Sequence, residues 1–228
     1  MSIFFQRFNG SRRSARAFTL IELLVVLSIV IVITAVLLVR QAQFNSSTLL
    51  RSLSYSIALS VRQAQVYGTT VFGSAIAQGS CTGGTYNFGS CFAPAYGIYV
   101  SSGDTAHYYI FGDLNNNGRY DAGEAIQTFT LGSGYTISQF CAGRITGSTQ
   151  DCWISTGGGV LSSLSTVFKR PNPDACFSTD TNPTVCSTGV NPLYASSSIQ
   201  VVAGSGDTRT VVVTQTGQIA VCPVNRSC

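Results

Sequence analysis

The sequence predicts an α+β protein in which one long N-terminal helix precedes a head of antiparallel β-strands. Residues 18–39 form an unbroken apolar run, and neither proline nor glycine occurs between that run and Gly68. After Gly68 the composition changes to glycine, serine, threonine, valine and aromatic residues. With 228 residues, of which only 10% are charged, the chain is long and apolar enough to bury a core.

The apolar run is expected to cross a membrane. It reads FTLIELLVVLSIVIVITAVLLV, with a single charge. At about 1.5 Å per residue it makes a helix of roughly 33 Å, which spans a bilayer core of ~30 Å. Four arginines precede the run and Arg40 follows it, so the positive-inside rule places the N-terminus in the cytoplasm and the remainder outside.

Two ordinary interpretations of this segment fit less well. A cleaved secretory signal has an apolar region of about 7–15 residues followed by a small-residue cleavage site. The one A-x-A triplet here, residues 15–17, lies before the run instead. A plain membrane anchor stays open, but it leaves Glu22 unexplained, because an unpaired carboxylate inside an apolar helix costs several kcal/mol.

The leader and the start of the run resemble a known family. An arginine-rich segment, a small residue and then Phe-Thr-Leu-Ile-Glu-Leu-Leu-Val-Val-Leu are similar to the class III signal of type IV pilins and type II secretion pseudopilins. The resemblance implies that a prepilin peptidase cuts between Ala17 and Phe18 and methylates Phe18. It also implies that Glu22 pairs with the N-terminal amine of a neighbouring subunit, which makes both buried charges tolerable. The family usually has glycine where this chain has Ala17.

The helix is predicted to continue to about Tyr67. Beyond Arg40 it becomes amphipathic, with an apolar stripe at a spacing of three and four that is expected to pack on the sheet of the head: Leu50, Leu53, Ile57, Val61 and Ala64. The predicted organisation is a leader at 1–17, a transmembrane and assembly helix at 18–39, an amphipathic helix at 40–67 and a β-rich head at 68–228.

Alternating or β-branched runs, separated by turn pairs such as Asn117-Gly118 and Thr216-Gly217, predict nine strands in the head. These are 70–77, 96–101, 106–111, 125–131, 135–140, 160–168, 198–203, 208–214 and 217–222. Residues 170–192 hold most of the prolines and little apolar content, so they are expected to form a long surface loop.

The cysteines all follow the apolar run, on the side expected to face the exterior. An even number in an oxidising compartment predicts disulfides. Zinc is the alternative, but no C-x-x-C pair occurs and His107 is the one histidine. Short loops close at low entropic cost. We therefore predict pairing of neighbours: Cys81–Cys91, Cys141–Cys152, Cys176–Cys186 and Cys222–Cys228.

Residues 113–124 match the twelve-residue calcium loop D-x-[DN]-x-[DN]-G-x₅-E. Its candidate ligands are one backbone carbonyl, from Arg119, and the side chains of Asp113, Asn115, Asn117, Asp121 and Glu124. The flanking residues look like strands rather than EF-hand helices. The alternative is a polar hairpin tip in which asparagine and glycine supply only turn geometry.

The charge distribution and the rarity of key residues exclude several functions. The formal charge of +4 comes from the four leader arginines, since residues from Phe18 onward carry nine charges of each sign. A generally basic nucleic-acid-binding surface is therefore not expected. Lys169 is the only lysine and His107 the only histidine, so phosphate-loop and H-E-x-x-H motifs cannot occur. We expect no enzymatic activity.

The second half of the chain extends the resemblance. Residues 167–175, 199–202 and 209–219 are similar to the C-terminal half of GspH/FimT pseudopilin heads, in which hairpin tips like 113–124 also recur. The resemblance implies a minor pilin or pseudopilin that helps to initiate or cap a filament, with other pilin subunits, the prepilin peptidase and the inner membrane as its partners. A minor pilin that binds DNA during natural transformation and a membrane-anchored adhesin are the alternatives.

Overall fold

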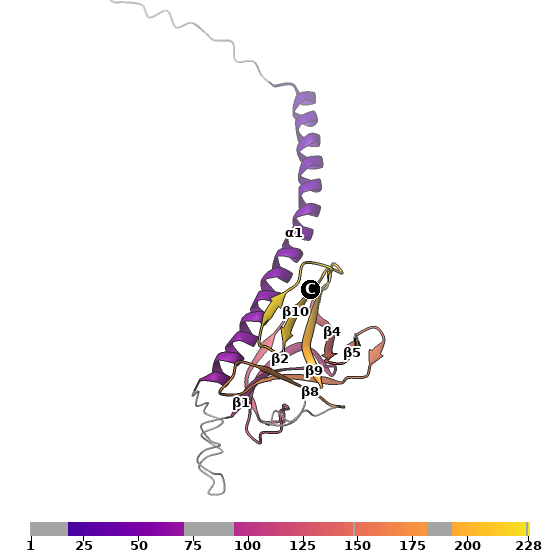
Figure 1. Ribbon diagram of the computed structural model, residues 1–228. Coiled ribbons are helices and arrows are strands. Elements are labelled where there is room, and N and C mark those ends of the chain that lie inside the picture. The colour runs from indigo at the N-terminus through magenta and orange to yellow at the C-terminus, as the bar shows by residue number, and fades with distance from the viewer. Residues whose placement is uncertain (1–17, 71–93, 148, 182–192, 227) are drawn as a thin grey trace, which may run out of the picture. The chain divides into compact units, whose positions relative to one another are not determined.

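The computed structural model describes residues 18–70, 94–147, 149–181, 193–226 and 228. The chain divides into two compact units, Met1–Gln43 and Phe44–Cys228. Helix α1 (Leu20–Thr69) supplies all of the described helical structure, and strands β1 to β11 follow it. The fold is α+β, with antiparallel sheets in the head, as the sequence predicts (Figure 1).

Helix α1 begins where a side chain caps it. The Thr19 hydroxyl accepts a hydrogen bond from the Glu22 amide at 3.3 Å, so Thr19 is the N-cap and Glu22 occupies the third helical position. This T-x-x-E spacing is that of a capping box, and a carboxylate in the first turn also interacts favourably with the helix dipole. The predicted end near Tyr67 lies within two residues of the observed end at Thr69.

The first sheet has the order β3-β2-β1-β7-β8. Its strands are β1 (Ala95–Ser101), β2 (Asp104–Asp113), β3 (Ala125–Thr130), β7 (Ser163–Phe168) and β8 (Ala175–Thr179). The second sheet has the order β11-β10-β9-β4-β5-β6. Its strands are β4 (Tyr135–Arg144), β5 (Gln150–Ile154), β6 (Gly158–Gly159), β9 (Tyr194–Ala203), β10 (Thr208–Thr214) and β11 (Ile219–Val221).

The core of the head combines both sheets with the second half of α1. Leu50, Ile57, Val61 and Ala64 of the predicted apolar stripe are buried, while Leu53 is partly buried. They join one cluster with side chains from both sheets, including Ile110, Phe140 and Val211. Burial of such a stripe, rather than intrinsic helix propensity, is what stabilises a helix in a folded protein. The prediction that this face packs on the head is confirmed.

Two sequence expectations for the head need correction. Residues 170–192 were expected to form a surface loop, but Ala175–Thr179 form strand β8, in which Phe177, Ser178 and Thr179 are buried. Strand β8 pairs with β7, and this pairing gives a proline-rich segment its extended structure. Strands β5 and β6 were not anticipated. The predicted strand at 70–77 and the rest of that loop, 182–192, lie outside the described residues.

Candidate functional site

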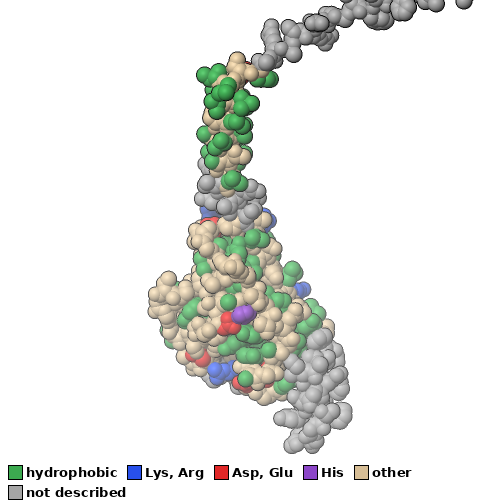
Figure 2. All heavy atoms as spheres, turned by 180° about the vertical axis from the view of Figure 1, so that it is seen from behind, with side chains coloured by type: hydrophobic (Ala, Val, Ile, Leu, Met, Phe, Trp, Pro, Cys, Tyr) green, Lys and Arg blue, Asp and Glu red, His purple; other side chains and the backbone are tan. Residues whose placement is uncertain are grey.

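The first part of α1 exposes an almost continuous apolar surface. Between Phe18 and Leu38 the exposed fractions of the large apolar side chains range from 49% to 78%. The Ser28 hydroxyl donates to the carbonyl of Val25, and the Thr34 hydroxyl donates to the carbonyl of Val30. Both hydroxyl groups are therefore hydrogen-bonded within the helix and do not depend on water as a partner. This cover of hydrophobic side chains is visible along the helix in Figure 2.

The same segment is long enough to span a bilayer. Residues Leu20–Leu38 have a mean hydropathy of 3.0 and, among the described helical residues, form the single candidate membrane span by length and composition. Ala17, the residue before the predicted cut, lies outside the described residues. Phe18 is exposed and directly precedes the capping residue Thr19, which places it at the very start of the apolar surface.

Comparison with known families agrees with this geometry. Residues 12–38 match the model of the prokaryotic N-terminal methylation motif. The chain carries the N-terminal signal of a type IV pilin-like prepilin. The match covers the end of the predicted leader, the predicted cut and nearly all of the predicted assembly helix, and it implies processing by a prepilin peptidase. No curated protein and no solved structure matches the chain.

In the head, the candidate calcium loop is held together by its own hydrogen bonds. The Asp113 carboxylate accepts the amides of Asn117 at 3.0 Å and Gly118 at 2.8 Å. The Glu124 carboxylate accepts the amides of Leu114 and Asp121, each at 2.9 Å. These contacts are turn hydrogen bonds between the loop's carboxylates and its own backbone.

The remaining candidate ligands take part in the same turn. The side-chain amides of Asn115 and Asn117 both donate to Asp121 at 2.7 Å, and the Asn117 oxygen accepts the Arg119 amide. Within the described part of the chain, no three His, Cys, Asp or Glu side chains are grouped so as to hold a metal ion. Calcium binding by this loop therefore stays a prediction.

Burial raises the pKa of two of the loop carboxyls above their ordinary values. For Asp113 the burial outweighs the hydrogen bonds from the amides of Gly118 and Asn117, which lower the pKa. For Glu124 the nearby charges of Asp113 and Asp121 add to the effect of burial. Both carboxyls are therefore easier to protonate in the folded head than in the unfolded chain.

Tyr120 folds the hairpin tip back onto the outer face of the first sheet. Its ring lies 4.5 Å from that of Tyr99 and 5.6 Å from that of Tyr109. Asp104 accepts hydrogen bonds from the Tyr109 hydroxyl at 2.7 Å and from His107 at 2.8 Å. The hydrogen bond to Asp104 raises the pKa of Tyr109 to about 12. His107, visible beside an acidic side chain in Figure 2, is thus hydrogen-bonded to Asp104 at the surface of the head.

Two of the predicted disulfides are present, Cys141–Cys152 and Cys222–Cys228. Cys141 lies directly opposite Cys152 on the neighbouring strands β4 and β5, so this bond closes a hairpin. Cys176 is disulfide-bonded, while its predicted partner Cys186 lies outside the described residues. The predicted pair Cys81–Cys91 also lies outside them.

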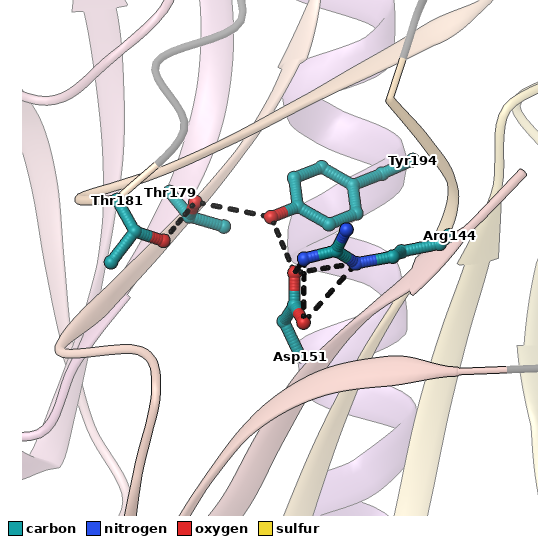
Figure 3. Close-up of polar contacts among 5 residues, drawn as sticks. All are labelled: Arg144, Asp151, Thr179, Thr181 and Tyr194. Carbon is teal, nitrogen blue, oxygen red and sulfur yellow. Dashed lines mark hydrogen bonds and ion pairs between the residues drawn. The ribbon is translucent and has the colours of Figure 1, made fainter.

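A buried polar cluster near that hairpin was not anticipated from the sequence. Asp151, 8% exposed, accepts the hydroxyl of buried Tyr194 at 2.9 Å and pairs with Arg144, also at 2.9 Å (Figure 3). The Tyr194 hydroxyl lies 3.5 Å from that of Thr179 on β8, which in turn contacts Thr181. The cluster therefore connects strands of the two sheets through polar contacts.

Proposed function

We propose that the protein is a minor pilin or pseudopilin, a structural subunit that helps to initiate or cap a type IV pilus or a type II secretion pseudopilus. The observation that carries the proposal is the prepilin motif at residues 12–38, placed on a helix whose apolar side chains are exposed on its surface. Such a surface suits a lipid bilayer before assembly and a bundle of helices after it. The proposed role is structural and not enzymatic.

The proposed maturation begins in the inner membrane, with the N-terminus in the cytoplasm and the head on the other side. The prepilin peptidase cuts between Ala17 and Phe18 and methylates the new N-terminus. The helix then leaves the bilayer, and lateral packing of its leucine and valine side chains against other subunits replaces their contact with lipid. The sequence motif and the single candidate span of Leu20–Leu38 among the described residues support this order of events.

Glu22 has the central role in the proposed assembly step. Its carboxylate pairs with the free amine of a neighbouring subunit, so that two charges in an apolar bundle compensate each other and fix the register. The structure adds a second property of this residue, since Glu22 is at the third position of a helix capped by Thr19. Helix capping alone would need a polar side chain at that position but not a charge.

The arrangement of helix and strands in the head supports the proposal of a GspH/FimT-like subtype. The segments that carry the resemblance, 167–175, 199–202 and 209–219, include parts of strands β7, β9, β10 and β11. A helix packed on antiparallel sheets is the architecture that this resemblance implies. A low-copy position at one end of the filament follows from the subtype, and the machine that the subunit serves is left open.

The test is a comparison of two variants at Glu22 in cells that assemble filaments. Both Glu22→Ala and Glu22→Gln should be cut and methylated normally, yet be depleted from sheared filaments, because neither can neutralise the amine. The glutamine variant keeps the capping side chain and so isolates the charge. Normal incorporation of both variants would refute the assembly role, and normal incorporation of Glu22→Gln alone would reduce Glu22 to a capping residue.

A further inference from the structure

A groove on the head runs between the second half of α1 and strand β11. One wall is formed by α1 side chains that include Tyr55, Leu59 and Arg62, and the other by residues 216–221. The volume of the groove is about 810 Å³. Gln65 closes its floor, since the Gln65 side-chain amide donates to the carbonyls of Pro173 at 2.9 Å and Gly217 at 3.1 Å.

The α1 wall is an apolar stripe that faces away from the core of the head. Tyr55, Leu59 and Val66 are 47%, 69% and 46% exposed, and their spacing of four and seven residues places them on one face of the helix. Of these, Tyr55 and Leu59 line the groove. The opposite face carries the buried residues Leu50, Ile57 and Val61. Helix α1 is thus apolar on two faces, and only one of them is buried against the head. An exposed contiguous apolar patch of this kind marks a contact surface.

The other wall is an unpaired sheet edge. The Cys222 amide donates to Thr210 at 2.8 Å and the Thr214 amide donates to Gln218 at 2.9 Å, which makes Val212 and Ala220 a hydrogen-bonded pair between them. By the alternation of antiparallel ladders, the backbone N–H and C=O groups of Ile219 and Val221 point away from β10. Within the described residues no strand pairs with this edge.

One arginine, Arg62, lines the groove, and a second, Arg51, lies next to the groove residue Tyr55. Arg62 donates to Gln65, and the guanidinium of Arg51 lies 5.8 Å from the centre of the Tyr55 ring. Among the described residues, the ion pairs are those of His107 with Asp104 and of Arg144 with Asp151. Arg51 and Arg62 therefore have no carboxylate partner in the described part of the head. A segment that binds in the groove and complements this positive charge carries an acidic side chain.

We propose that the groove receives an extended segment of a neighbouring subunit, which adds a strand to the edge of β11 and presents an acidic side chain to Arg62. The edge supplies N–H and C=O groups for main-chain hydrogen bonds, and the stripe of Tyr55 and Leu59 receives alternate apolar side chains. This inference rests on the proposed function, because it requires that the prepilin enters a filament.

The first experiment measures how much of each full-length variant enters sheared filaments. Leu59→Glu and Arg62→Glu should each reduce incorporation at least about tenfold, while leader cleavage stays normal. Arg62→Lys keeps the positive charge and should therefore enter filaments almost as well as the natural sequence. Val160→Glu is the matched control, because Val160 is 64% exposed and does not line the groove.

The second experiment measures amide hydrogen exchange in filaments and in detergent-solubilised subunits of the same chain. Strand addition should slow exchange at Ile219 and Val221 at least about tenfold on assembly, with little change at Ala220, whose amide is already bonded to β10. Unchanged exchange at Ile219 and Val221 would overturn the added strand.

The Glu22 variants separate the failure of this inference from failure of the proposed function. If Leu59→Glu and Arg62→Glu enter filaments like the natural sequence while Glu22→Gln does not, the groove is not an interface but the chain is still a filament subunit. If the natural sequence and all of these variants are absent from sheared filaments although the leader is cut, the proposed function fails and the inference fails with it.

Discussion

Replacing Asp151 with asparagine is expected to destabilise the head measurably, although the side chain keeps its size. Asp151 is 8% exposed and accepts the hydroxyl of Tyr194, itself 1% exposed, at 2.9 Å. A hydrogen bond to a charged acceptor contributes about 1.5–3 kcal/mol, and one to a neutral acceptor about 0.5–1.5 kcal/mol. We assign no stabilisation to Arg144, because its side chain is 37% exposed and solvent screens its charge.

The loss should therefore be about 1–1.5 kcal/mol. For a domain of this size it corresponds to a decrease of about 2–6 °C in melting temperature. The assay is thermal unfolding of the full-length chain in detergent, followed by near-ultraviolet circular dichroism, with Asp174→Asn as the control because Asp174 is exposed. Tyr194→Phe should cost a similar amount.

The double variant decides whether the two residues act together. If the Tyr194–Asp151 hydrogen bond is the source of the effect, Asp151→Asn with Tyr194→Phe should cost clearly less than the sum of the single variants. Strict additivity, or a change for Asp151→Asn no larger than that of Asp174→Asn, would refute the reasoning.

Three further predictions concern the loops of the head. Because burial raises the pKa of Asp113 and Glu124, the stability that they contribute is present at low pH and is lost as the pH rises through the raised values. The melting temperature of the natural sequence minus that of Glu124→Gln should therefore become larger as the pH is lowered from about 7 to about 4. If this difference stays constant with pH, the pKa shifts are contradicted. Gly217→Ala should lower the melting temperature by several degrees, since Gly217 has a φ of 78° and a Cβ there would meet the Pro173 carbonyl; an unchanged value would count against this strain. If the 113–124 loop binds calcium as its sequence pattern predicts, about 1 mM calcium should raise the melting temperature of the full-length chain; an unchanged value would leave the loop a polar hairpin tip.

Features that depend on local sequence could be predicted. The length of α1 follows from the absence of proline and glycine between residues 18 and 67, and its buried face follows from the spacing of Leu50, Ile57, Val61 and Ala64. The prepilin motif is equally local, since its residues are adjacent in the chain. Thr19 was overlooked as the helix cap, although the T-x-x-E spacing with Glu22 indicated it.

Features that depend on pairing between distant residues were missed. Strand β8 has little strand character of its own, and its structure comes from pairing with β7, in which Val167 lies opposite Cys176 of β8. The contact of Asp151 with Tyr194 joins residues 43 positions apart, which no local pattern reveals. The neighbouring pair with Arg144 could have been found, because the predicted Cys141–Cys152 bond sets β4 against β5 and brings residues 144 and 151 together.

The most direct test of the proposed function is the mass of the N-terminal peptide of the protein recovered from sheared filaments. The account predicts a chain that lacks residues 1–17 and begins at Phe18 carrying one methyl group on its amine. Recovery of the protein with residues 1–17 intact, from cells with an active prepilin peptidase, would contradict it and favour a membrane-anchored protein independent of a filament.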